Sequence, residues 1–83
     1  MPKFRKRPVV IDAVQFRTSE HPSELAADVE AGRVRYPEDG NAMIDTLEGS
    51  MIARPGDWII RGVKGELYPC RDDIFRATYE AVE

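Results

Sequence analysis

Apolar residues come in short runs separated by turn-forming residues, a pattern typical of a small domain built from several short strands. The first run is rich in β-branched residues and apolar on both alternating faces, which predicts a strand at about 8–16 that is covered on both sides or crosses a small barrel wall. Later runs predict strands at 34–36, 42–47, 50–53, 57–61, 66–70 and, at the end of the chain, 78–82.

Two segments between these runs predict helices. Pro22 suits the first turn of a helix and Gly32 supplies a left-handed stop, so a helix is expected at 22–31. Its acidic residues, Asp28 among them, are expected to point away from the core. A second, shorter helix is expected at 71–77, capped by one of the two aspartates near its start.

The segment 57–70 predicts a hairpin whose register follows from its side chains. If residues 62–65 form the connection, three chemically matched pairs face one another: Arg61 with Glu66, Ile60 with Leu67, and Ile59 with Tyr68. Each matched pair contributes roughly 0.2–1 kcal/mol, and a shift by one residue loses all three. The pair of Arg61 and Glu66 is expected at the surface, so that Arg61→Ala leaves the protein folded.

Together these segments predict a single α+β domain over 1–83. The expected architecture is a meandering antiparallel sheet of about five to six short strands, curled into a half-open barrel or roll, with one short helix after the first strand and a helical turn near the C-terminus. A chain of 83 residues buries only roughly 60% of its unfolded surface. Homo-oligomerisation is one way to widen the resulting narrow margin of stability.

Charge limits the classes of partner. Twelve Lys/Arg and fifteen Asp/Glu give a net charge of −3 and a pI near 5.1, which argues against generic binding to duplex nucleic acid. The first seven residues nevertheless form a basic strip of Lys3, Arg5, Lys6 and Arg7. This strip suits either a phosphate backbone or the protection of an exposed edge by charge.

The apolar runs are too short for a membrane or an export signal. None approaches the roughly 20 residues of a membrane span, and no uninterrupted apolar stretch follows the basic strip. We therefore expect no membrane association and a protein that stays in the compartment where it is made.

The sequence contains no constellation typical of catalysis. One cysteine cannot form an intrachain disulfide, and one histidine with one cysteine cannot complete a structural zinc site. Cys70 is a potential nucleophile with His21 as its base, but a lone cysteine after a strand more often acts as a small buried hydrophobe. With no nucleophile elbow and no phosphate-binding glycine loop, we expect a non-enzymatic protein with no catalytic residue, metal or cofactor.

Two polar residues of the first strand are candidates for a site. Asp12 lies among apolar residues and Gln15 follows three positions later. A buried carboxylate requires donors, so Asp12 either pairs with an arginine of a neighbouring strand or lines a pocket and accepts N–H groups of a ligand.

A second set of candidates lies on the predicted hairpin and just before it. Trp58 and Tyr68 are amphipathic aromatics, and basic residues beside aromatic rings suit stacked bases with phosphates. The candidate ligand or partner-binding residues of this hairpin region are Arg54, Trp58, Arg61, Lys64, Glu66 and Tyr68. The alternative is ordinary sheet packing, in which the only Trp fills the core.

Both ends of the chain resemble a group of small proteins of tailed phages and prophages. Residues 3–16, a basic opening followed by PVVIDAVQF, are similar to their PVVVEAVQ strand. Residues 55–70, PGDWIIRGVKGELYPC, with the later IF and TYE, are similar to their PGDWIIKGVKGEFYPC…DIF…TYE ending. The resemblance implies a viral origin and a host-cytoplasmic setting, and it carries no catalytic residues.

These observations lead to a function by binding. We expect a phage accessory protein that acts in the host cytoplasm, with a host protein or a small nucleotide-like ligand as its partner. An inhibitor of a host or defence factor needs an exposed patch, whereas an oligomeric sponge for a small nucleotide signal needs a concave pocket with convergent polar groups. A small hydrolase and a nucleic-acid-binding protein are less favoured.

Overall fold

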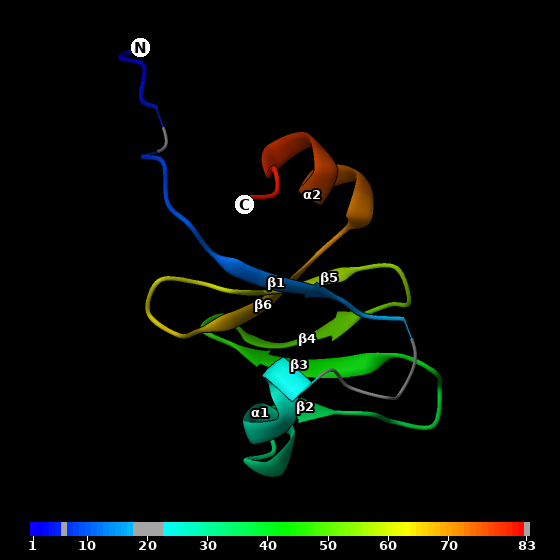
Figure 1. The fold of residues 1–83 in the computed structure, drawn as a ribbon. Helices are drawn as coiled ribbons and strands as arrows, with labels where there is room; N and C mark the ends of the chain where they lie inside the picture. The colour runs from blue at the N-terminus through cyan, green and yellow to red at the C-terminus, as the bar shows by residue number, and fades with distance from the viewer. Residues whose placement is uncertain (6, 18–22, 83) are drawn as a thin grey trace.

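The chain folds into two small antiparallel sheets with short helices at their margins (Figure 1). The computed structural model describes residues 1–5, 7–17 and 23–82. The first sheet has the order β1-β5-β6, formed by Asp12–Gln15, Trp58–Arg61 and Leu67–Cys70. The second sheet has the order β2-β3-β4, formed by Val34–Arg35, Ala42–Thr46 and Gly49–Ala53. The helical segments are the 3₁₀ turn η1 (Ser23–Leu25), α1 (Ala26–Glu30) and α2 (Asp72–Thr78).

The predicted α+β class is confirmed, with six strands and both expected helices. The strands are divided between two sheets, and the described residues form no closed barrel. The first strand, β1, pairs with β5. Two backbone hydrogen bonds extend this pairing from the end of β1 to the turn before β5: the Phe16 N–H donates to Asp57 O at 2.8 Å, and the Gly56 N–H donates to Phe16 O at 2.7 Å. A simple meander is therefore replaced by a long-range pairing.

The main core lies between the two sheets, with α2 on the opposite face of the first sheet (Figure 1). Ile59 and Leu67 face the second sheet, where Ile44 and Val34 are almost fully buried. Ile60 is also fully buried but has the other orientation on β5, as expected for adjacent strand residues. The central strand β5 thus supplies both faces of its sheet with apolar side chains.

The predicted register of the β5–β6 hairpin is wrong by one residue. Arg61 lies opposite Leu67, Ile60 opposite Tyr68, and Trp58 opposite Cys70. The inter-sheet core provides the physical reason, because it needs Ile59 and Leu67 on one face of the sheet. Burial of these two side chains outweighs the small gain from a surface pair of Arg61 with Glu66.

The turn of this hairpin is compatible with the observed register. The Gly62 N–H donates to Glu66 O at 2.8 Å and the Gly65 N–H donates to Gly62 O at 3.0 Å, which leaves a three-residue loop. Gly65 has a φ of +81°, the left-handed conformation that such a loop requires at its last position.

Both ends of the chain are less regular than predicted. The first strand spans only Asp12–Gln15, and residues 1–5 and 7–11 have no regular structure. The closing strand predicted at 78–82 is wrong, because α2 ends at Thr78 and the described residues after it form no strand. Tyr79 instead continues the last helical turn, its N–H donating to Phe75 O at 2.9 Å and its ring lying 5.0 Å from that of Phe75.

The hairpin turn predicts different responses to alanine at its two glycines. Gly65→Ala should lower the free energy of unfolding by about 1–2 kcal/mol, because a Cβ disfavours the left-handed conformation. At Gly62 the φ is not in that region, and the three atoms nearest to an added Cβ belong to the flexible carboxylate end of Glu66, which can move aside. Urea unfolding should therefore show a smaller loss for Gly62→Ala, and a larger loss at Gly62 than at Gly65 would contradict this turn.

Candidate functional site

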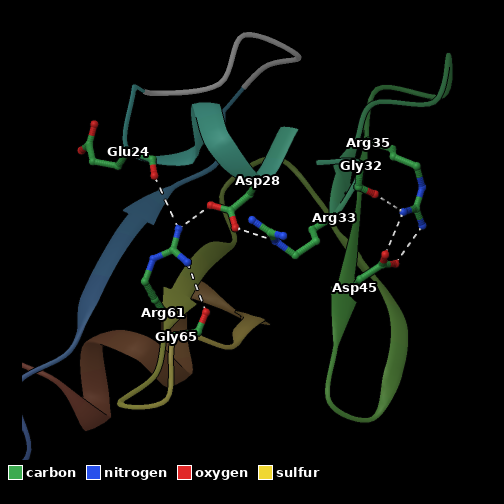
Figure 2. Close-up of polar contacts among 8 residues, drawn as sticks. All are labelled: Glu24, Asp28, Gly32, Arg33, Arg35, Asp45, Arg61 and Gly65. Carbon is green, nitrogen blue, oxygen red and sulfur yellow. Dashed lines mark hydrogen bonds and ion pairs between the residues drawn. The ribbon is translucent and has the colours of Figure 1, made fainter. Parts of the chain in front are cut away.

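Asp28 on α1 is a buried charged group that is bound by two arginines, Arg33 and Arg61 (Figure 2). Its side chain is only 2% exposed, so the prediction that it points away from the core is wrong. Arg33 Nε donates to Asp28 Oδ1 at 3.0 Å, and Arg61 Nη2 donates to Asp28 Oδ2. A carboxylate is tolerated here because two guanidinium groups compensate its loss of hydration.

Arg61 connects β5 to the helical segment. Besides Asp28, it donates to the backbone oxygens of Gly65 at 3.2 Å and Glu24 at 3.5 Å (Figure 2). The predicted pairing of Arg61 with Glu66 across the hairpin is therefore wrong. A guanidinium with three internal acceptors is also poorly suited to bind the phosphate of a ligand.

Electrostatics favour the ionised form of the Asp28 carboxyl. Burial by itself raises the pKa of Asp28. The hydrogen bonds from Arg61 and Arg33, together with their positive charges, lower this pKa by a larger amount. The net result is a pKa below the ordinary value. The pKa of Arg61 is raised in turn, chiefly by its hydrogen bond to Asp28.

Trp58 is part of an aromatic layer between the first sheet and α2. Its ring stacks on Phe75 with centroids 4.1 Å apart and planes 8° apart, and its Nε1–H donates to Asp72 Oδ1 at 2.8 Å. Arg61 lies on the opposite face of β5, so the two do not form the predicted base-stacking group. Trp58 therefore packs the sheet against the helix.

Gln15 belongs to the same layer. Its Nε2 group donates to Gly56 O at 2.9 Å and to Asp72 Oδ1 at 3.4 Å, which ties β1 to the turn before β5 and to α2. Asp72 accepts the hydrogen bonds from Gln15 and Trp58 instead of capping the helix, whose N-cap is Arg71 with no side-chain cap. The expected aspartate cap is therefore wrong.

Asp12 is exposed on an edge strand, so the premise that it is buried is wrong. It lies opposite Arg61 in the pairing of β1 with β5. It also lines two hollows, one of about 360 Å³ beside Arg61 and Glu24, the other of about 420 Å³ beside Trp58 and Tyr79. Both alternatives are compatible with this position, because Asp12 faces an arginine of the neighbouring strand, whose pKa its charge helps to raise, and also lines two hollows.

A largely apolar hollow lies between the tips of two hairpins and is called the hairpin groove below. Its volume is about 520 Å³. The β3–β4 hairpin contributes Thr46, Leu47, Glu48 and Met51, and the β5–β6 hairpin contributes Val63, Lys64, Glu66, Leu67, Tyr68 and Pro69. Two ordered turns thus provide its walls.

Large apolar side chains are exposed in this groove. Leu47 is 78% exposed, Val63 is 71% exposed and Met51 is 43% exposed. Leu47 was predicted to end a strand but lies in the β3–β4 turn, where the Thr46 hydroxyl donates to Gly49 O at 2.6 Å. That turn presents Leu47 to solvent, a position suited to contacting a partner.

Tyr68 adds a mostly covered aromatic wall to the groove. Its pKa is raised to about 12, first by burial and then by a hydrogen bond with Tyr79. The phenol is therefore protonated at neutral pH and is not poised as a base. The groove is suited to binding an apolar side chain beside the charged groups of Lys64, Glu48 and Glu66.

The structure brings together only part of the predicted site. Lys64, Glu66 and Tyr68 share the hairpin groove, whereas Arg61 and Asp12 meet at a separate hollow. The remaining candidates lie elsewhere: Trp58 and Gln15 in the aromatic layer, and Arg54 exposed outside the three hollows. Sequence reasoning missed Leu47, Met51 and Val63, although large apolar residues next to turns are a signal for exposed contacts.

The predicted nucleophile pair and the basic strip lie away from this groove. His21 and Lys6 lie outside the described residues. Cys70 is half-buried, its Sγ contacts Arg71 O at 3.6 Å, and burial followed by the charges of Asp57 and Asp73 raises the pKa of its thiol. The thiol form is thereby favoured over the nucleophilic thiolate. Lys3, Arg5 and Arg7 are exposed.

Comparison of the chain with protein-family models finds no match, and neither the curated proteins nor the solved structures show significant similarity to it. Within the ranges that the structure describes, no cluster of three or more His, Cys, Asp or Glu residues is arranged to hold a metal ion. No helix in those ranges is long and apolar enough to cross a membrane. The geometry and chemistry of the hairpin groove are therefore the main guide to function.

Removal of the Arg61 guanidinium should destabilise the protein strongly, contrary to the expectation from sequence. Arg61→Ala leaves Asp28 with Arg33 alone and should lower the free energy of unfolding by about 3 kcal/mol, measured by urea denaturation at pH 7. Arg35→Ala is the matched control, because Arg35 pairs with Asp45 on the surface with both side chains nearly half exposed. It should change stability little, and equal losses for the two variants would contradict the role of Asp28.

The Asp28 pair also predicts a loss of stability in acid. A carboxyl whose folded pKa lies below its unfolded value stabilises the fold above the unfolded pKa, about 3.9, and loses this contribution as the pH falls through the folded pKa. Unfolding measured from pH 6 to pH 2 should thus be less pH-dependent in Asp28→Asn, which should also be less stable near neutrality. Asp45→Asn, at an exposed pair, should keep most of the wild-type dependence, and an unchanged profile for Asp28→Asn would overturn this assignment.

Proposed function

We propose that this chain is a non-enzymatic accessory protein of a tailed phage or prophage that binds a host protein in the host cytoplasm and inhibits a host or defence factor. The phage setting rests on the resemblance of residues 3–16 and 55–70 to small phage proteins. The observation that carries the binding role is the hairpin groove, in which Leu47 and Val63 are largely exposed on two ordered turns.

The chemistry of the groove favours a protein partner over a nucleotide. Protein interfaces are centred on apolar and aromatic anchors with charged residues at their rim, as Leu47, Val63 and Tyr68 are placed here beside Lys64 and Glu66. A nucleotide requires convergent cations for its phosphates. Arg61, the predicted phosphate ligand, is already bonded to Asp28, so the nucleotide sponge receives less support.

A functional interface needs more surface than the groove alone. Stable complexes bury about 800 Å² on each partner, with a few central side chains supplying most of the free energy. We therefore assign the groove to the centre of the interface, with Leu47 and Val63 inserted into the partner or covered by it.

A double charge substitution in the groove tests this proposal. Leu47→Glu with Val63→Glu places two carboxylates in the groove and should abolish capture of the host partner from infected-cell lysate by the tagged chain. Both side chains are exposed, so the variant should stay folded, as circular dichroism and thermal unfolding would show. The lost partner should be identified by mass spectrometry.

Ile74→Glu is the matched control for this experiment. Ile74 is a 52% exposed apolar residue on α2, outside the three hollows, and its substitution should leave capture intact. Capture that survives the double substitution, or that is lost equally in Ile74→Glu, would move the binding surface away from the groove. Turnover of a substrate by the purified chain with no captured partner would overturn the binding role itself.

A further inference from the structure

The N-terminal segment 1–11, called the arm below, differs in charge from the rest of the chain. Four of its residues are basic and none is acidic, whereas residues 12–83 contain eight basic and fifteen acidic residues. The chain is therefore a cationic arm, with a side-chain charge of +4, attached to a body of charge −7. Opposite charges on the arm and the body favour contact between them.

The arm also carries an exposed aromatic residue. Phe4 is 94% exposed, between Lys3 and Arg5, and Figure 1 shows residues 1–5 extending away from both sheets. Exposure of a whole phenyl ring to water is unfavourable, so its burial against apolar side chains is favoured. Phe4 is thus an aromatic side chain that the described residues of its own copy leave almost uncovered.

The hairpin groove provides a matching surface. Leu47, Met51 and Val63 form an apolar hollow that accommodates a phenyl ring, and the groove carries two carboxylates, Glu48 and Glu66, against one ammonium group, Lys64. The flexible basic side chains that flank Phe4 reach such carboxylates while their stems cover apolar surface.

We propose that the hairpin groove of one copy binds the arm of a second copy, with Phe4 seated among Leu47, Met51 and Val63. An extended arm reaches well beyond its own sheet, since the eight residues from 3 to 10 span at most roughly 26–29 Å. Reciprocal exchange of two arms closes a twofold dimer with two identical contacts.

This inference rests on the proposed function, because the arm occupies the same groove as the host partner. Self-association and partner binding then exclude one another. The dimer covers exposed apolar surface until a partner displaces the arm, which would keep the groove protected on a small protein with a narrow margin of stability.

Sedimentation velocity on the full chain over roughly 1–300 µM tests the exchange. The wild type should shift with concentration from 9.4 kDa toward twice that mass. Phe4→Ala and Leu47→Glu should each raise the dissociation constant at least about tenfold, as expected for loss of a central anchor. Ile74→Glu should dimerise like the wild type.

Charge reversal tests the electrostatic contribution to the contact between the arm and the groove, and it has a control of its own. Arg5→Glu should weaken the dimer, and 1 M salt should do the same by screening. Arg54→Glu changes the net charge equally at an exposed position outside the three hollows and should have little effect. An equal effect of both reversals would overturn a specific contact between arm and groove.

Mixing two variants distinguishes exchange between copies from any contact within one copy. Phe4→Ala retains an intact groove and Leu47→Glu retains an intact arm, so a mixture should form a heterodimer with one contact and associate more tightly than either variant alone. A wild type that stays monomeric, or a mixture that gains nothing, overturns the exchange. Neither result affects the capture of a host partner, so failure of this inference is separable from failure of the proposed function.

Discussion

The burial of one carboxylate, Asp28, constrains how the helical segment meets the sheets. The charge is tolerated because Arg33 lies just beyond α1 and Arg61 extends from β5 to the same side chain. Arg61 also bonds backbone oxygens of η1 and of the β5–β6 turn, so one guanidinium joins three parts of the chain that are distant in sequence. In a domain whose core holds few large side chains, this contact specifies the position of a helix that is too short to be stable alone.

Two different surfaces result from the placement of β5 at the centre of the first sheet. One face packs against the second sheet, and the other carries Trp58 beneath α2, where Phe75 covers the indole ring. Both faces are occupied near the middle of the strands, but the hairpin turns extend beyond these layers. The exposed apolar groove lies there because Leu47 and Val63 are turn residues that neither layer covers.

The same arrangement separates the roles of the charged residues. Arg61 and Asp72 serve internal contacts, the first with Asp28 and the second with Trp58, whereas the charges at the groove remain at the surface. A basic residue near an aromatic residue in the sequence is therefore an ambiguous signal for a ligand-binding site. The basic side chain is available to a ligand only if no hydrogen-bond acceptor inside the fold already binds it, and Asp28 binds Arg61.

The sequence by itself determined the class of fold, the existence of both helices, most strands and the left-handed stop at Gly32, because apolar periodicity and backbone sterics act over a few residues. The tertiary structure alone decided the pairing of β1 with β5, the register of the β5–β6 hairpin and the inward orientation of Asp28. Each of these depends on contacts between residues far apart in the chain: Leu67 is required in a core that faces another sheet, and Asp28 becomes tolerable only when Arg61 reaches it. For the same reason the sequence predicted only some of the groove residues. Lys64, Glu66 and Tyr68 belong to the β5–β6 hairpin, whereas Leu47 and Met51 belong to the β3–β4 hairpin.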